Sequence, residues 1–122
     1  MDFLQAINKP IEKEIADFND FFKSQLNSDV VLMNDALSFL SESIGKMMRP
    51  TLVLLVAKSI GKIDEKAFSA AAAVEMLHTA SLLHDDVIDE SDKRRGRESM
   101  NVRFNNNVAV LAGDYLFSMA LN

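Results

Sequence analysis

The chain has 122 residues and carries 13 Lys and Arg against 18 Asp and Glu, which gives a formal net charge of −5. It contains no cysteine, so a disulfide-stapled scaffold and a cysteine-ligated zinc site are both excluded. The negative charge argues against nucleic acid as a partner, because that binding depends on neutralising phosphates. Apolar residues make up 48% of the chain, enough for a core, and the length suits either a small domain or a piece of a larger one.

No segment has the length and composition of a membrane span. The longest clean apolar run, Leu52 to Ala57, is far shorter than the roughly 20 residues that a transmembrane helix requires. Polar residues interrupt the amino terminus at Asp2, Gln5 and Lys9, so it lacks the apolar core of a signal peptide. We therefore expect a cytoplasmic protein without a transmembrane segment.

The first half of the chain shows helical periodicity. Apolar residues recur every three or four positions, which predicts an amino-terminal helix through Ile7, Ile11, Ile15, Phe18, Phe22 and Leu26. A second stripe from Val30 to Ile44 predicts another helix, which ends at Gly45. Pro50 then opens a short apolar helix that ends near Gly61.

The longest predicted helix follows Asp64, a good N-cap, and runs from Glu65 to Glu90. Its first half is mostly alanine, and small residues let neighbouring backbones approach, so we expect this helix to lie centrally. Residues 91–107 are predicted as loop with one short helix, and Asn107 caps a last apolar helix over residues 108–121. The predicted fold class is all-α.

An acidic cluster follows the apolar part of the longest helix. Five carboxylates occur in the eight residues from Asp85 to Asp92, and a helix places Asp85 and Asp89 on one face. Like charges at that spacing repel unless a cation lies between them, and magnesium binds through one or two carboxylates plus substrate phosphates. The alternative is a solvated acidic helix end. The apolar or small residues 80–83 favour a buried helix whose end faces a cleft.

Cations follow the acidic cluster directly, at Lys93, Arg94, Arg95 and Arg97. Guanidinium groups bind phosphate oxygens bidentately, so this run can form a phosphate clamp, although surface pairing with the acids is the alternative. Lys46 and Arg49 lie at the start of the helix led by Pro50, where free backbone N–H groups also attract anions. The alternative for these two residues is a solvated turn. His78 lies seven residues before Asp85 on the same face, as a further candidate or as a satisfied core histidine.

Together these residues resemble the trans-isoprenyl diphosphate synthases, the polyprenyl synthetase family. Residues 82–89 with Ser91-Asp92 and Arg94-Arg95-Gly96 resemble its first aspartate-rich motif and trailing arginine pair. Residues 45–50 are similar to its Gly-Gly-Lys-Arg-x-Arg-Pro signature, with departures at Ile44 and Met47 that lose one glycine and one cation. Residues 113–116 match a further stretch. Terpene cyclases share the acidic motif, so that motif alone is a weak indication, whereas the combination of motifs in this order is specific to the polyprenyl synthetase family. The resemblance extends from about Lys9 onward.

The resemblance implies a role for each matched residue. Asp85 and Asp89 would ligate magnesium (Mg2+), with Asp86 assisting, and Arg94 would contact an allylic prenyl diphosphate. The residues implied to hold the diphosphate of isopentenyl diphosphate are Lys46, Arg49, His78 and Arg95. The implied reaction is head-to-tail condensation, in which magnesium and Arg94 stabilise the charge on the departing diphosphate. The family also implies a homodimer.

The resemblance also bears on product length. Ser81 and Ala80 lie four and five residues before Asp85, one helical turn or about 5.4 Å behind the metal site. Both are small, whereas bulky aromatic residues there would block a growing hydrocarbon tail. The chain also lacks the two-residue insertion typical of shorter-chain bacterial enzymes between Asp86 and Asp89. We therefore expect a long, octaprenyl-like product, and replacing Ala80 with Phe should shorten it.

Family members are more than twice as long as this chain and carry a second aspartate-rich motif, which is absent from residues 1–122. We therefore expect the amino-terminal portion of an isoprenoid-synthase-type helical bundle, which lacks prenyl transfer activity when isolated. One alternative is a non-catalytic helical subunit that completes a partner synthase. A terpene cyclase fragment is another, and a plain helical interaction module would leave the ordered charge motifs unexplained.

Overall fold

The structure, a computed structural model, describes residues 3–42 and 45–121. The elements in chain order are α1 (Phe3–Asn8), the 3-10 turn η1 (Lys9–Ile11), α2 (Glu12–Gln25), α3 (Val31–Ser41), α4 (Met48–Ile60), α5 (Glu65–Ile88), β1 (Lys93–Arg94), β2 (Arg97–Glu98), α6 (Met100–Arg103) and α7 (Asn106–Leu121). Helices therefore dominate, and the all-α fold class is confirmed. None of the helices within the described ranges is long and apolar enough to cross a membrane.

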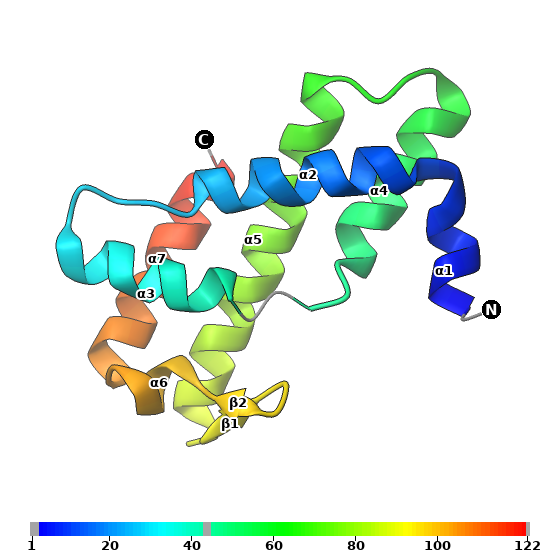
Figure 1. The fold of residues 1–122 in the computed structure, drawn as a ribbon. Coiled ribbons are helices and arrows are strands. Elements are labelled where there is room, and N and C mark those ends of the chain that lie inside the picture. The colour runs from blue at the N-terminus through cyan, green and yellow to red at the C-terminus, as the bar shows by residue number, and fades with distance from the viewer. Residues whose placement is uncertain (1–2, 43–44, 122) are drawn as a thin grey trace.

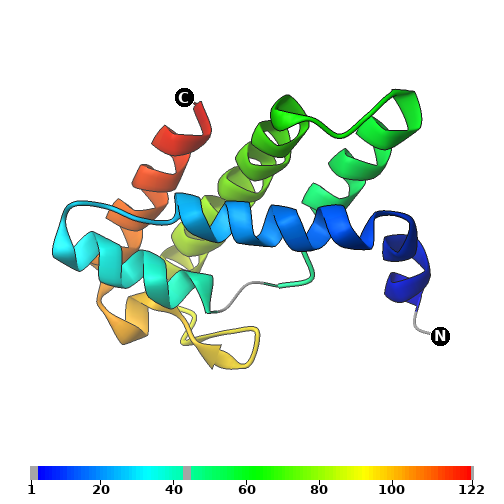
Figure 2. The ribbon, with the colours of Figure 1, turned by 45° about the horizontal axis from the view of Figure 1, so that its top comes forward.

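Helices α4, α5 and α7 lie side by side and run antiparallel to their neighbours, with α5 in the middle (Figures 1 and 2). The most extensive packing in the molecule joins α5 to α7 and to α4, while α2 crosses this layer (Figure 1). Ala71 and Ala72 of α5 are buried, as the close approach of three helices requires. The predicted central position of the longest helix is confirmed.

Side chains from α2 and α5 build the aromatic part of the core. The ring of Phe18 stacks on that of Phe22 with centroids 5.9 Å apart and meets Phe68 edge-on at 5.8 Å. Leu37 from α3 and Leu54 from α4 complete this core and are fully buried. The residues that fill the core therefore come from the two apolar stripes in the first half of the chain and from α4, α5, α6 and α7.

Both ends of α5 have a local cause. Asp64 caps the amino terminus, since its Oδ1 accepts the Ala67 N–H at 3.0 Å. The helix ends at Ile88, two residues before the predicted end, because Glu90 adopts a left-handed φ of 55°. The Glu90 and Ser91 N–H groups then donate to Val87 and Asp86 carbonyls, which is the Schellman arrangement.

Three predicted helix boundaries need correction. The first apolar stripe does not form one helix, because Pro10 lacks an N–H and divides it into α1, η1 and α2. Helix α3 already ends at Ser41, and Ile44, where the second stripe was expected to end, lies outside the described residues. Helix α4 begins at Met48, so Pro50 occupies its first turn, where no N–H is needed. The predicted end of α4 near Gly61 is confirmed.

The start of α7 also differs from the prediction. Asn105 caps this helix in place of Asn107, since its Oδ1 accepts the Val108 N–H at 2.8 Å. Asn107 itself is the second residue of α7, which begins at Asn106. Three successive asparagines offered equivalent candidates, and only the backbone conformation distinguishes them.

A short hairpin occupies part of the segment predicted as loop. Strands β1 and β2 pair antiparallel, with Arg94 opposite Arg97. Arg95 and Gly96 form the two-residue turn, and their φ angles of 56° and 78° define a type I′ turn. Sequence periodicity could not find strands of two residues, because they are too short to alternate. The predicted short helix in this segment is α6.

Candidate functional site

Four predicted residues from three separate parts of the sequence line one cavity. Lys46 precedes α4, Arg49 lies in its first turn, His78 lies in the middle of α5, and Arg95 is in the hairpin turn. Together they border an open cavity of about 430 Å³, which we call the cation cavity. Its remaining lining residues are Gly45, Met47, Met48 and Glu75. The fold thus brings together the residues expected to hold the diphosphate of isopentenyl diphosphate, and their role stays a prediction.

The backbone beside the cation cavity has a special conformation. Met47 adopts the left-handed region at φ 55° and ψ 38°, which costs a residue with a side chain about 1 kcal/mol. Its side chain is buried, so the position at which the family signature carries a cation contributes to the core. A Cβ on Gly45 would lie 2.7 Å from the Arg95 Nε. The glycine of this signature therefore lets the Arg95 side chain pass closely over the backbone.

The electrostatics of the cavity follow from its cations. Burial lowers the pKa of His78, and the positive charges of Arg49, Arg95 and Arg94 lower it further. His78 is therefore neutral at neutral pH and offers a hydrogen bond rather than a charge to an anion. The positive electrostatic potential of the cavity therefore comes from Lys46, Arg49 and Arg95.

Glu75 is a cavity residue that the sequence analysis missed. It lies in α5, only 5% exposed, and burial raises its pKa against the opposing effect of Arg95 and Arg49. One signal could have identified it: between Ala67 and Leu83, Glu75 is the only residue with a carboxylate or a permanent charge. A single carboxylate in a buried apolar run requires a partner.

The acidic end of α5 divides into two environments. Asp85 and Asp89 are exposed and lie four residues apart on one face. Asp86 is 2% exposed and accepts two hydrogen bonds from Arg94, from Nη2 to Oδ1 at 2.5 Å and from Nε to Oδ2 at 3.2 Å. These hydrogen bonds raise the pKa of Arg94. Asp86 and Arg94 thus tie the hairpin to α5, and their expected roles at a metal and a diphosphate remain predictions.

The exposed carboxylates of Asp85 and Asp89 suit magnesium when substrate phosphates and water supply the other ligands. Among residues 3–42 and 45–121, no three His, Cys, Asp or Glu side chains gather where they could hold a metal. The described part of the chain therefore offers the carboxylate pair of Asp85 and Asp89 at this site, without a third protein ligand beside it. Magnesium is commonly bound by one or two carboxylates together with substrate phosphates and water, so the pair fits that mode of binding.

His84 of the acidic motif packs against the Gly113-Asp114 motif of α7. Its Nε2 lies 3.1 Å from the Val110 carbonyl oxygen and 3.3 Å from Asp114 Oδ1. A Cβ on Gly113 would lie 2.4 Å from the same Nε2. Glycine at this position thus allows the two motifs to meet, although nothing in the sequence indicated that they are in contact.

The two residues expected to control product length differ in burial. Ala80 is completely buried, and its carbonyl oxygen lies 3.3 Å from the position of a Cβ on Gly113. Ser81 is exposed and donates its hydroxyl hydrogen bond to the Leu77 carbonyl. In this chain, therefore, Ala80 belongs to the interface between α5 and α7, and Ser81 alone of the two faces outward.

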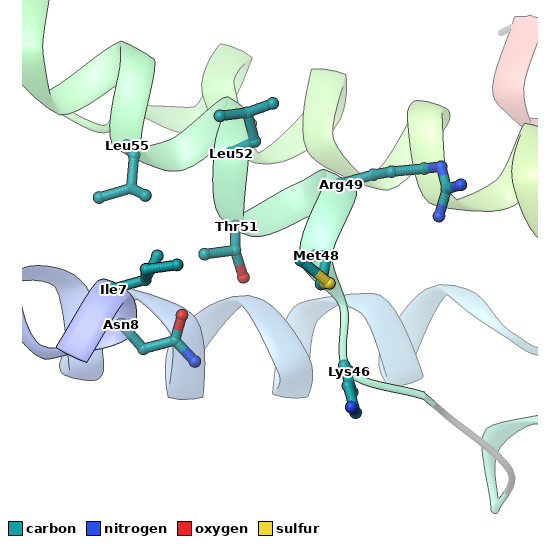
Figure 3. Close-up of a pocket in the computed structure, with 8 residues that line it drawn as sticks. All are labelled: Ile7, Asn8, Lys46, Met48, Arg49, Thr51, Leu52 and Leu55. Carbon is teal, nitrogen blue, oxygen red and sulfur yellow. The ribbon is translucent and has the colours of Figure 1, made fainter. Parts of the chain in front are cut away.

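A second hollow lies beside the cation cavity, between α1 and α4 (Figure 3). It measures about 390 Å³ and is mainly apolar, with walls that include Ile7, Leu52 and Leu55. Figure 3 shows Arg49 extending away from the other side chains that line it. Lys46, Met48 and Arg49 border both spaces, so the start of α4 forms the wall between them.

The helical layer carries a cation cavity and an exposed carboxylate pair, the combination expected of the isoprenoid synthase class. Residues 30–122 match the polyprenyl synthetase family, and the chain belongs to that family. It is 42% identical to the all-trans-nonaprenyl-diphosphate synthase (geranyl-diphosphate specific) of Rhodobacter capsulatus, over 100% of this chain and 38% of that protein. It is 40% identical to the octaprenyl diphosphate synthase of Escherichia coli K12, over 96% and 36%.

Solved structures agree with these relatives. The polyprenyl synthase of Caulobacter crescentus, crystallised with calcium and isoprenyl diphosphate, superposes with a TM-score of 0.89 at 33% identity. That match covers 97% of this chain and 36% of the other. A decaprenyl diphosphate synthase from Rhodobacter capsulatus gives a TM-score of 0.86 at 35% identity, over 97% and 37%. The chain thus spans little more than a third of the length of the relatives it matches.

Proposed function

We propose that this chain supplies one side of the active site of a trans-polyprenyl diphosphate synthase. The reaction condenses isopentenyl diphosphate with an allylic prenyl diphosphate to give a longer, octaprenyl-like product. The observation that carries the proposal is the convergence of Lys46, Arg49, His78 and Arg95 on one cavity. Long-chain synthases among the relatives support the expected product length.

Each side of the proposed site has a separate task. Lys46, Arg49 and Arg95 bind the diphosphate of isopentenyl diphosphate, and neutral His78 adds a hydrogen bond without further charge. Asp85 and Asp89 would hold magnesium at the end of α5, and the chemistry that such a metal would supply there is neutralisation of the negative charge on the allylic diphosphate. We also propose that the protein acts as a homodimer, an expectation that sedimentation of the purified protein tests directly.

Binding of inorganic pyrophosphate tests the cation cavity without requiring turnover. We expect calorimetric titration of the chain to show binding that Arg49→Met weakens by at least tenfold, because a charged bidentate contact is lost. Arg103→Met is the matched control, since Arg103 is exposed on α6 and carries the same charge. Equal weakening by both variants would mean that the cavity is not the binding site.

Magnesium tests the acidic side. We expect magnesium to strengthen pyrophosphate binding in the wild type and to lose that effect in Asp85→Asn and Asp89→Asn. In an activity assay with magnesium, isopentenyl diphosphate and farnesyl diphosphate, we expect the 122 residues alone to be inactive. No prenyl diphosphate longer than the farnesyl substrate should be formed. Product formation would contradict the proposal that this chain supplies only one side of the site.

A further inference from the structure

We propose that Glu75 positions the guanidinium groups of Arg49 and Arg95 at the wall of the cation cavity, an inference that rests on the proposed diphosphate site. Glu75 is a positioning residue in this account and does not touch substrate. It acts as the negative partner that keeps two arginines at fixed places before an anion arrives.

The location of Glu75 is the first support. It is 5% exposed and borders the cation cavity on one side. On its other side it borders a small internal space whose walls include Phe22, Leu26 and Leu40. Arg95 lines both spaces together with Glu75. The carboxylate therefore lies between the apolar core and the cations.

The charge around the cavity is the second support. Lys46, Arg49 and Arg95 surround one open space, and such like charges repel at close range. Long side chains under mutual repulsion spread into solvent unless an anion orders them, and ordering them on binding costs affinity. Arg95 and Arg49 both interact electrostatically with Glu75. Among the residues that line the cation cavity, Glu75 is the one with an acidic side chain, so it is the residue that can offset this repulsion.

The periodicity of α5 is the third support. Glu75 and Asp86 are eleven residues apart, which is about three helical turns and places both on the same face. Asp86 holds Arg94 of the hairpin by two hydrogen bonds. Arg95 is the next residue along the hairpin and borders the same space as Glu75. The same face of α5 therefore carries two buried carboxylates, one bound to Arg94 and the other beside a space that Arg95 also lines.

The order of arginine side chains tests this role in the chain itself. In 15N relaxation of the arginine Nε–H groups, we expect Arg49 and Arg95 to be nearly as ordered as Arg94, with exposed Arg103 as the mobile reference. Glu75→Gln should release Arg49 and Arg95 and leave Arg94 ordered, because Asp86 still holds it. A purely structural role would not single out these two groups.

Matched variants separate position from net charge. Glu98→Gln makes the same change in charge at an exposed residue of β2 and should leave all three arginines ordered. Glu75→Asp keeps the charge and should restore part of the order that Glu75→Gln removes. We expect pyrophosphate affinity to fall about tenfold in Glu75→Gln relative to Glu98→Gln, because the arginines must then be ordered on binding.

Two results would overturn the proposal. The first is a failure of Glu75→Gln to act as expected, seen either as undiminished order of Arg95 or as a pyrophosphate affinity equal to that of Glu98→Gln. The second needs no variant and therefore holds even if Glu75→Gln does not fold: wild-type Arg49 and Arg95 signals as mobile as that of Arg103. If Glu75 orders the arginines but the wild type binds no pyrophosphate, the proposed function fails and the positioning role stands.

Discussion

The contact between His84 and Gly113 gives a quantitative prediction for Gly113→Ala. The new Cβ would lie 2.4 Å from His84 Nε2 and 2.6 Å from Cδ2, so the ring must move by about 1 Å to reach ordinary van der Waals contact. Repacking costs about 1–3 kcal/mol, and loss of the 3.1 Å contact with Val110 oxygen costs about 1 kcal/mol. Alanine regains about 1 kcal/mol of helix propensity. The net loss in the free energy of unfolding is about 2 kcal/mol.

Urea and thermal unfolding followed by circular dichroism measure this loss. At about 4 °C per kcal/mol for a chain of this length, Tm should fall by about 8 °C. In a His84→Ala background the ring is gone, so Gly113→Ala should no longer destabilise the protein and should gain up to about 1 kcal/mol from helix propensity. The same loss in both backgrounds would refute the reasoning. Gly61→Ala is the control, because nothing lies within 4 Å of a Cβ there, and it should change stability by less than about 0.5 kcal/mol.

The remaining predictions concern a helix cap and two buried carboxylates. Asn105→Ala should cost about 1 kcal/mol in urea unfolding and Asn107→Ala under about 0.5, a ranking that equal losses would contradict. Arg94→Met leaves buried Asp86 without its partner and should cost about 3 kcal/mol, so a neutral result would show the ion pair to be dispensable. Burial raises the pKa of Glu75 above its ordinary 4.5, so the folded state binds this proton more tightly than the unfolded state. Wild-type stability should therefore fall, relative to Glu75→Gln, as pH rises from 4.5 through the raised pKa, and parallel stability profiles for the two would contradict this.

The helical fold could be predicted because its causes are local. Asp64 caps α5 where the sequence indicated, and Gly61 ends α4. Errors occurred where backbone geometry overrides the apolar pattern. Pro10 divides a continuous stripe, and the left-handed turn at Arg95 and Gly96 closes a hairpin too short for any periodicity.

The site was predictable only as far as its residues lie in linear motifs. Lys46, Arg49 and His78 each stand in a recognisable local pattern, and the structure gathers them around one cavity. Glu75 stands in none, since its significance arises from burial against arginines that are distant in sequence. The pairing of Asp86 with Arg94 likewise depends on which carboxylate of a run of five turns inward, and neighbouring residues in the sequence do not fix that.

Helix α5 sets the distance between the two proposed diphosphate positions. His78 at the cation cavity and Asp85 at the acidic end are seven residues apart on this one helix, a rise of about 10.5 Å that no loop interrupts. The spacing of the two proposed diphosphate positions is therefore fixed by regular helix geometry and does not depend on how flexible segments settle. Deleting a single residue between His78 and Asp85 would shorten this helical segment by only about 1.5 Å. It would, however, rotate one side of the proposed site by about 100° relative to the other.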